Sequence, residues 1–207
     1  MTLTSGSAIR VALTAVGEQL AFQSARVGIV VVGGAALNLL GIVERSTSDV
    51  DVIAFGAAAS RGAEPTIHQP PDPMPRALEL AIATVARDLR LDPGWLNTEP
   101  ALQWRQGLPL GLGSRVSWHH YGPRDAASVG LDVGLVSRLD LIFLKLYAAV
   151  DHATTRSVHY RDLLALSPTA DELGMAAAWI LPQNASPEFH AILDQVVAHV
   201  RRPVDGE

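Results

Sequence analysis

The sequence contains no cysteine and one lysine, Lys145, while the remaining basic residues are all arginines. Without cysteine, the chain forms neither disulfide bonds nor thiolate metal sites, which fits a reducing compartment. No apolar run approaches the roughly 20 residues that a membrane span requires. Residues 1–5 lack the basic-then-apolar pattern of a signal peptide. We therefore expect a cytoplasmic protein with no membrane partner.

The 207 residues suit one domain, or one domain with a helical appendage. Apolar residues make up 48% of the chain, which is typical of a globular protein. The formal net charge is −5, so the molecule as a whole does not attract nucleic acid. A nucleic-acid partner would have to meet a local cluster of arginines.

Hydrophobic periodicity places the strands, with helices between some of them, in the first two thirds of the chain and a helical tail after them. The predicted strands are residues 28–32, 49–55, 115–121 and 129–136; the predicted helices are 7–24, 35–43, 75–91 and a series from 137 onward. Residues 56–73 are rich in Gly, Ala and Pro and indicate a loop. We expect an α/β core over residues 1–136 and a helical region over 137–207, packed as one compact unit.

Two glycines end the first predicted strand. A phosphate can approach the backbone of Gly33 and Gly34 closely, because no Cβ stands in the way. The helix expected after them presents free N–H groups and the positive end of its dipole to the same anion. The turn therefore predicts an anion-binding site.

Two aspartates follow on the next predicted strand. Asp49 and Asp51 lie two residues apart, so their side chains are expected on one face. At about 4 Å and a near-surface dielectric, two such charges repel by about 4 kcal/mol. Protonation, an arginine or a cation must relieve this repulsion. The hard oxygens of such a pair suit Mg²⁺ (or Mn²⁺), and Mg²⁺ is typically held by one or two carboxylates plus substrate phosphates. Such a pair is often just two solvated acids, but Arg45 and Thr47, directly before it, favour a phosphate site.

These segments resemble the signature of the DNA polymerase β-like nucleotidyltransferase superfamily. The matching residues are Val32-Gly33-Gly34-Ala35 and Arg45-x-Thr47-x-Asp49-Val50-Asp51. In that superfamily the acid-apolar-acid motif binds the divalent metal that bridges the NTP phosphates. The second glycine takes a place often held by serine, which removes one hydroxyl contact. A third carboxylate is usual on a later strand, and the resemblance makes Asp132 the candidate.

Lys145 lies in a predicted helix that is otherwise apolar from Leu141 to Val150. A lysine here can extend its ammonium group to solvent, which is the ordinary interpretation. In a chain that otherwise uses arginine, it is also a candidate point-charge phosphate ligand. Asp162, 17 residues later, either caps its short helix or faces the same cleft as Lys145.

This second region resembles the later half of the AbiE/MenT-type nucleotidyltransferase toxins. The matching residues are Asp140-Leu141, Lys145-Leu146, Ala148 and Asp151, followed by Arg161-Asp162-Leu163-Leu164-x-Leu166. In that group the lysine contacts the nucleotide phosphates and the later aspartate completes the site. The resemblance assigns these roles to Lys145 and Asp162. It also implies a tRNA 3′ end as acceptor and a cognate antitoxin protein as partner.

Other polar and aromatic residues give weaker signals. His119 and His120 are adjacent on a predicted strand and point to opposite faces, so we expect them to be structural or surface residues. The tryptophans are expected to anchor the core or an interface, with base stacking by one of them as the alternative. Five arginines either form an RNA-facing patch or lie on solvated helix faces: Arg76, Arg87, Arg90, Arg105 and Arg115.

The sequence thus predicts an α+β fold, with a nucleotidyltransferase-like mixed sheet flanked by helices and a C-terminal helical region. The expected function is an enzyme that transfers a nucleoside monophosphate from an NTP to an acceptor. The expected catalytic residues are Asp49, Asp51, Lys145 and Asp162; the nucleotide contacts are Gly33, Gly34, Arg45, Thr47 and Lys145; the metal ligands are Asp49, Asp51 and Asp132. One alternative acceptor is a small-molecule hydroxyl, as in aminoglycoside-modifying relatives. Another alternative is a catalytically silent relative that binds a nucleotide or a protein.

Overall fold

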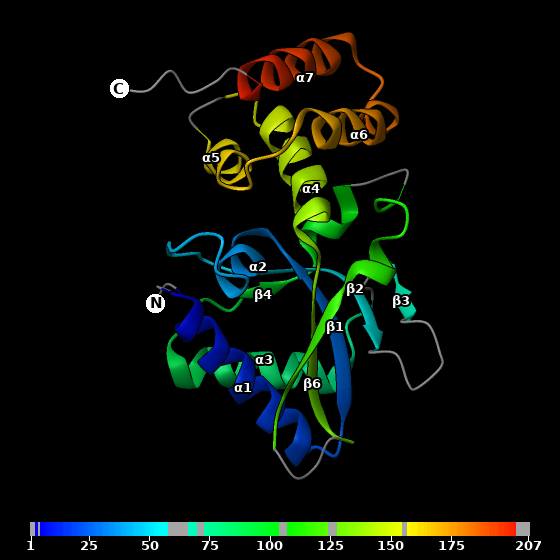
Figure 1. Cartoon of the computed structure of the whole chain (residues 1–207). Helices are drawn as coiled ribbons and strands as arrows, with labels where there is room; N and C mark the ends of the chain where they lie inside the picture. Colours follow the sequence, from blue (N-terminus) through cyan, green and yellow to red (C-terminus); the bar gives the residue numbers. More distant parts are fainter. Residues whose placement is uncertain are drawn as a thin grey trace. The chain divides into compact units, whose positions relative to one another are not determined.

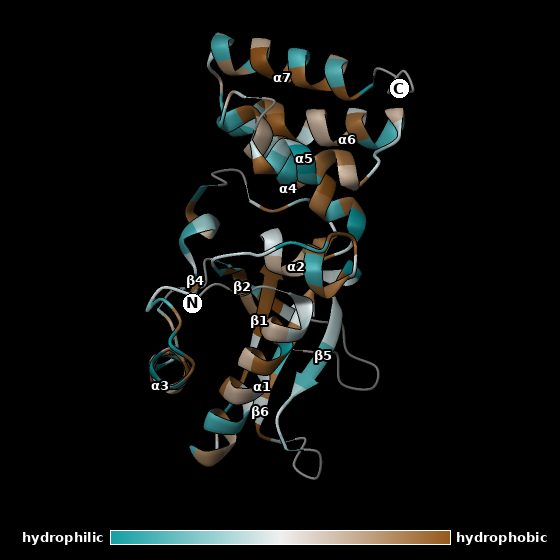
Figure 2. Cartoon of the chain, turned by 90° about the vertical axis from the view of Figure 1, so that its left-hand side faces the viewer, coloured by the Kyte–Doolittle hydropathy of each residue, from teal (hydrophilic) through white to brown (hydrophobic). Residues whose placement is uncertain are grey.

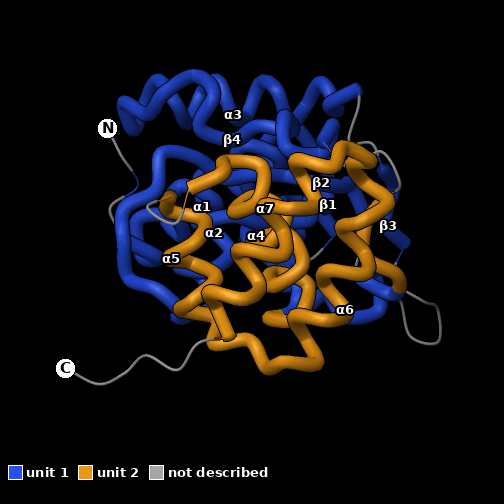
Figure 3. The backbone as a smooth tube through the Cα atoms, turned by 90° about the horizontal axis from the view of Figure 1, so that it is seen from above, with its two compact units in different colours: residues 1–103, 111–137 blue, residues 104–110, 138–207 orange. Residues whose placement is uncertain are grey.

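The computed structural model of the chain describes residue 3 and residues 5–57, 66–69, 73–103, 107–123, 128–154 and 157–201. The chain divides into two compact units (Figure 3). The sheet unit comprises Met1–Gln103 and Gly111–Ser137, and the helical unit comprises Trp104–Leu110 and Arg138–Glu207. The periodicity of the sequence indicated the division near residue 137, but not that residues 104–110 group with the helices.

The sheet unit is built on a mixed, open sheet of six strands within the described residues, in the order β3-β2-β1-β6-β5, with β4 also paired to β2 (Figure 1). The strands are β1 (Arg26–Val32), β2 (Val50–Ala57), β3 (Thr66–His68), β4 (Leu96–Asn97), β5 (Ser117–Tyr121) and β6 (Gly130–Leu135). Central β1 is antiparallel to β2 and parallel to β6. The apolar run of β1 is buried from Ile29 to Val32, so its side chains are covered on both faces of the sheet.

In the described part of the sheet unit, three α-helices accompany the sheet: α1 (Gly6–Phe22), α2 (Gly33–Leu39) and α3 (Arg76–Leu89). The Ser5 side chain caps α1 by accepting a hydrogen bond from the Ala8 N–H at 3.2 Å. Helix α1 packs against β1, β5, β6 and α3, and Figure 2 shows it lying over the sheet. The α+β class predicted from the sequence is confirmed.

The structure adds elements that composition did not indicate. Strand β2 continues to Ala57, and β3 pairs with it, so part of the Gly/Ala/Pro-rich segment is extended structure. The remainder, residues 58–65 and 70–72, lies outside the described residues. Strand β5 begins at Ser117 instead of Arg115, because residues Leu112–Arg115 form a 3₁₀ turn.

The helical unit contains α4 (Arg138–Asp151), α5 (Val158–Ala165), α6 (Ala170–Ile180) and α7 (Pro187–Val200). Helix α4 contacts each of the other three. In the core of the helical unit, the rings of Phe143 and Tyr147 pack against that of Trp179, with ring centroids 5.9 and 6.3 Å apart. Thr169 and Glu172 form a capping box at the start of α6, which satisfies two N–H groups of its first turn.

Arg138 ties α4 to the start of α6. Its Nη1 lies 2.6 Å from Glu172 Oε1, and its Nε donates to the Leu166 carbonyl at 2.9 Å. Gln183 donates to the Gly107 carbonyl at 3.3 Å, which attaches the described part of residues 104–110 to this unit. None of the helices in the described ranges combines the length and apolarity needed to cross a bilayer.

Candidate functional site

Gly33 and Gly34 are the first two residues of α2 and directly follow β1. Gly33 has a φ of +71°, a left-handed conformation that glycine adopts without a steric penalty. This helix has seven residues, fewer than two full turns, so its dipole adds little to anion binding. An anion here would therefore depend on the glycine backbone and on neighbouring side chains.

The side chains predicted to surround this turn are packed against it. A Cβ on Gly33 would overlap Oδ2 of Asp51. A Cβ on Gly34 would lie 2.8 Å from Thr47 Oγ1 and 3.0 Å from Arg45 Nη2. Both glycines are thus required by close approach, and the structure brings together the two halves of the predicted motif.

A buried amide holds this arrangement in place. Asn38, 6% exposed, donates from Nδ2 to the Gly34 carbonyl at 2.9 Å and accepts from the Arg45 N–H at 3.3 Å. It links the turn to the segment that carries Arg45 and Thr47. Asn38 is not among the residues predicted from the sequence; its signal was one amide in an otherwise apolar helix.

Thr47 is fixed by its backbone and by its hydroxyl. Its N–H and C=O exchange hydrogen bonds of 3.0 Å with Leu3, and it is 7% exposed. Its Oγ1 lies 3.3 Å from the Asp49 carbonyl and 3.4 Å from Asp49 Oδ1. Thr47 therefore positions the first aspartate beside the glycine turn.

The two aspartates stand at the start of β2. Asp49 precedes the strand, and Asp51 pairs in register with Val32 at the end of β1. Both are half-buried. Between Val30 and Val31 the register with β2 shifts, which leaves Ile53 as an extra residue. The alternation expected through residues 49–55 therefore breaks at this bulge, and bulges of this kind re-aim neighbouring side chains.

The donor set at this position fits a hard divalent cation. Asp49 and Asp51 supply carboxylate oxygens, and Mg²⁺ commonly takes its other ligands from substrate phosphates and water. Within the described ranges, no three His, Cys, Asp or Glu side chains gather as a metal site. A cation held here would thus depend on the two aspartates and on the nucleotide itself.

The structure separates Asp132 from this pair, against the expectation that it supplies a third ligand. Asp132 pairs with Gly28, four residues before Val32 along β1, or about 13 Å away at the rise of a strand. It is 4% exposed and accepts hydrogen bonds from Arg26 Nε at 2.7 Å and His120 Nδ1 at 3.0 Å. Its level in the sheet follows from the register of β6, which a local motif does not reveal.

Lys145 and Asp162 meet inside the helical unit. Lys145 Nζ, on α4, lies 2.8 Å from Asp162 Oδ2, on α5, and the two side chains are 5% and 2% exposed. The structure thus joins the two residues that the second motif singled out. Lys145 does not extend its ammonium to solvent, so the ordinary interpretation of this lysine is wrong.

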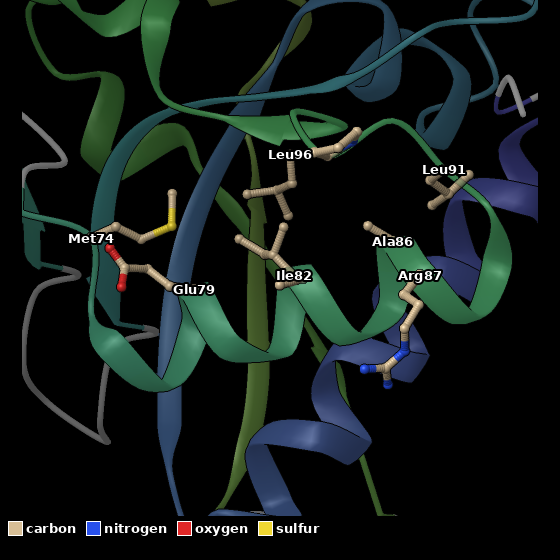
Figure 4. Close-up of a pocket in the computed structure, with 9 residues that line it drawn as sticks. Met74, Glu79, Ile82, Ala86, Arg87, Leu91 and Leu96 are labelled. Carbon is tan, nitrogen blue, oxygen red and sulfur yellow. The ribbon is translucent and has the colours of Figure 1, made fainter.

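An apolar pocket of about 510 Å³ lies between α3 and β4 (Figure 4). Ile82 of α3 and Leu96 of β4 point toward each other across it, and Met74 closes one end. Its charged lining residues are Glu79 and Arg87, which form ion pairs with other residues of α3. None of the predicted site residues lines this pocket.

Comparison of the chain with models of known families, with curated proteins and with solved structures found no match. The motif resemblance therefore remains a proposal, and the chemistry of the site has to be argued from its own geometry.

Proposed function

We propose that this protein is a metal-dependent nucleotidyltransferase that transfers a nucleoside monophosphate from an NTP to an acceptor hydroxyl. One observation carries the proposal: Gly33 and Gly34 are packed so closely against Asp51, Thr47 and Arg45 that neither glycine leaves room for a side chain. The two glycines thus lie beside a cation, a hydroxyl and the carboxylate of Asp51, with Asp49 next to Thr47, and this set of groups suits a metal-bound polyphosphate.

The roles of the residues follow from their chemistry. Asp49 and Asp51 would hold Mg²⁺ or Mn²⁺, which would neutralise the triphosphate and stabilise the charge that develops in transfer. Arg45 and Thr47 would orient phosphate oxygens, since a guanidinium and a hydroxyl both donate hydrogen bonds. The acceptor oxygen attacks the α-phosphorus, the α–β bridging P–O bond breaks, and pyrophosphate leaves. The acceptor proton passes to a nearby base.

By resemblance to the toxin motif, Lys145 would contact a phosphate and Asp162 would support it; the two form an ion pair within the helical unit. A buried ion pair rarely improves stability over an apolar pair of similar volume, because both charges lose their hydration. Retention of the only lysine in such a pair supports a role beyond stability. Their resemblance to the toxin motif supports the tRNA 3′ end as acceptor and a cognate antitoxin as partner.

A second candidate is a relative that binds a nucleotide without transferring it. The observation that favours it is the position of Asp132, about 13 Å along the strand direction from the level of Asp51, where it cannot act as a third carboxylate. This candidate predicts NTP affinity without release of pyrophosphate.

The test is incubation of the protein with Mg²⁺, total tRNA and each α-labelled NTP, beside Asp49→Ala and Lys145→Ala. Label on tRNA from one NTP, lost in the Asp49→Ala variant, is the expected result. Label on a small hydroxyl compound instead would support the transfer activity and show that tRNA is not the acceptor. Binding of an NTP by folded protein, with no transfer to any acceptor, would establish the second candidate.

Growth on expression tests the toxin assignment separately. Wild-type protein should arrest the host, while Asp49→Ala, expressed to the same level, should not. If enzyme that is active in the transfer assay does not affect growth, the toxin and antitoxin assignments are refuted and the proposed transfer reaction still stands.

A further inference from the structure

One face of the sheet continues from Asp51 toward the opposite end of the strands. On β1, residues 26, 28, 30 and 32 share a face, because side chains alternate along a strand. Register extends this face to Asp132 and Gly134 on β6 and to Trp118 and His120 on β5. Because of the bulge at Ile53, Asp51 and Gly56 of β2 also lie on this face. Asp51 pairs with Val32, and Gly56 lies at the level of Gly28.

Helix α1 takes the other face. The β6 residues that point there, Leu131, Val133 and Leu135, are buried, and α1 contacts β5 and β6 (Figure 2). Next to Asp51 this face carries the buried side chains of Val30 and Val32. Toward the other end of β1 it carries glycines and the exposed or half-buried side chains of Arg26, Trp118 and His120.

Trp118 lies across this face on a floor of glycines from three strands. A Cβ on Gly28, Gly56 or Gly134 would come within 3.4, 3.1 and 3.1 Å of the six-membered part of its indole. Trp118 is half-buried, and its Nε1 has no hydrogen-bond acceptor within the described residues. Contacts of the six-membered ring with these glycines therefore position the indole against the sheet.

Beyond Trp118, Asp132 holds two nitrogen-bearing side chains at the far end of the face. The side chain of Arg26 is 47% exposed and that of His120 is 30% exposed. Arg26 uses Nε toward Asp132, which leaves its two terminal nitrogens for a phosphate. Asp132 is buried and engaged by both partners, so it positions them without facing a ligand.

We propose that this face binds the 3′-terminal single strand of an RNA acceptor, with a base stacked on Trp118 and a phosphate on Arg26. The proposal rests on the nucleotidyltransferase function, because the strand would run toward the carboxylate pair. Aromatic side chains on a sheet face are a common means of binding single-stranded RNA. Stacking suits an enzyme of acidic net charge, since it does not depend on bulk attraction to the phosphates.

Affinity for a short, 5′-fluorescein-labelled single-stranded RNA with a free 3′ hydroxyl tests the proposal by fluorescence anisotropy. Trp118→Ala should weaken binding roughly 5- to 100-fold, the range expected for one stacked base. Arg26→Gln should weaken it about 3- to 10-fold and lower the salt slope by about one. Matched controls are Phe22→Ala, an exposed aromatic on α1, and Arg201→Gln, an exposed arginine that follows α7.

Thermal unfolding and Mg²⁺–NTP binding show which variants are intact, and Arg26→Gln covers the case in which Trp118→Ala fails to fold. Equal RNA affinity in wild type and Arg26→Gln, or an equal loss in the controls, overturns the proposal. So does wild-type protein that labels a small acceptor but binds no RNA, and the enzymatic function then stands. In a further outcome, wild-type protein binds RNA but no NTP, and Trp118→Ala and Arg26→Gln both lose RNA binding. That outcome supports RNA binding on this face and refutes the enzymatic function.

Discussion

Lys145 Nζ lies 2.8 Å from Asp162 Oδ2 in the interior of the helical unit, with both side chains at most 5% exposed. Truncation of either partner leaves a buried charge without its counter-ion. We expect Lys145→Met or Asp162→Leu alone to lower the free energy of unfolding by about 3–5 kcal/mol. Chemical denaturation of each variant measures this loss.

The double variant Lys145→Met/Asp162→Leu separates structure from function. Because an apolar pair of similar volume replaces the ion pair well, its stability should return close to that of wild type. Nucleotide transfer should stay abolished if Lys145 contacts phosphate. A double variant that is both stable and fully active would show that the pair has a structural role alone.

Gly33→Ala should be more damaging than Gly41→Ala, although both glycines have a φ of +71°. The left-handed conformation alone costs about 1–2 kcal/mol for alanine, and this applies at both positions. A Cβ at Gly41 meets nothing within 4 Å, whereas one at Gly33 overlaps the Asp51 carboxylate. We expect a further loss of about 1–3 kcal/mol at Gly33.

Urea unfolding of the two glycine variants compares these stabilities, and NTP binding supplies an independent measurement. Gly41→Ala should bind NTP as wild type does, and Gly33→Ala should not. Equal stability losses in the two variants would contradict the close approach of Gly33 and Asp51.

The fold was predictable where local pattern decides it. The apolar run of β1, the periodicity of α1 and α3, and the Thr169–Glu172 capping box each announce their element within a few residues. Strand β3 was not predictable, because it forms only through pairing with β2. With three residues, β3 is too short to show the alternation that marks a strand in a sequence.

The candidate site shows the same division. The glycine turn and the acids that contact it are close in sequence, so a short motif contained them. Asp132 was misassigned, because its position depends on the register between β6 and β1. Asn38 was overlooked because its two partners, Gly34 and Arg45, are identified only by the folded path of the chain.

The stability of the helical unit should decrease in acid through Glu172. The hydrogen bond from Arg138, assisted by the backbone N–H of Thr169, holds the pKa of Glu172 below its ordinary value. Because its pKa is lower in the folded state, the ionised Glu172 carboxylate stabilises the fold at pH values above the unfolded-state pKa of about 4.3. This contribution is lost as the pH falls. Wild type should therefore exceed Glu172→Gln in stability at neutral pH and converge with it in acid.

Thermal unfolding of the two proteins as a function of pH measures this convergence. In an Arg138→Gln background, where the main cause of the shift is gone, the same comparison should show a much smaller pH-dependent difference. A constant gap between wild type and Glu172→Gln down to acid pH would contradict the assignment to ionisation.

Tyr160→Phe should stabilise the protein, whereas Tyr121→Phe should destabilise it. The Tyr160 hydroxyl is buried with no hydrogen-bond partner in the described part of the chain, a situation that costs about 1–3 kcal/mol. The Tyr121 hydroxyl has a hydrogen bond with the Arg10 guanidinium, so its removal should cost about 1 kcal/mol. Denaturant titration of both variants at neutral pH checks the opposite signs.

Alkaline pH gives a second measurement on Tyr160. Burial raises the pKa of its hydroxyl above the ordinary value, so the unfolded chain ionises first. The contribution of the protonated hydroxyl to the free energy of unfolding is fully present below about pH 10 and is lost as the pH rises above it. Tyr160→Phe should remove that loss, and an unchanged alkaline profile would show that the hydroxyl is not the responsible group.

The extra residue at Ile53 imposes a constraint on insertion and deletion during evolution. Asp51 and Gly56 are an odd number of residues apart, and strict alternation would turn them to opposite sides of the sheet. Deletion of one residue between them would leave Asp51 and Gly56 recognisable in an alignment. It would, however, turn the side chains of the rest of β2 to the opposite face of the sheet. A designer who transplants β2 into another scaffold must therefore transfer its length as well as its acids.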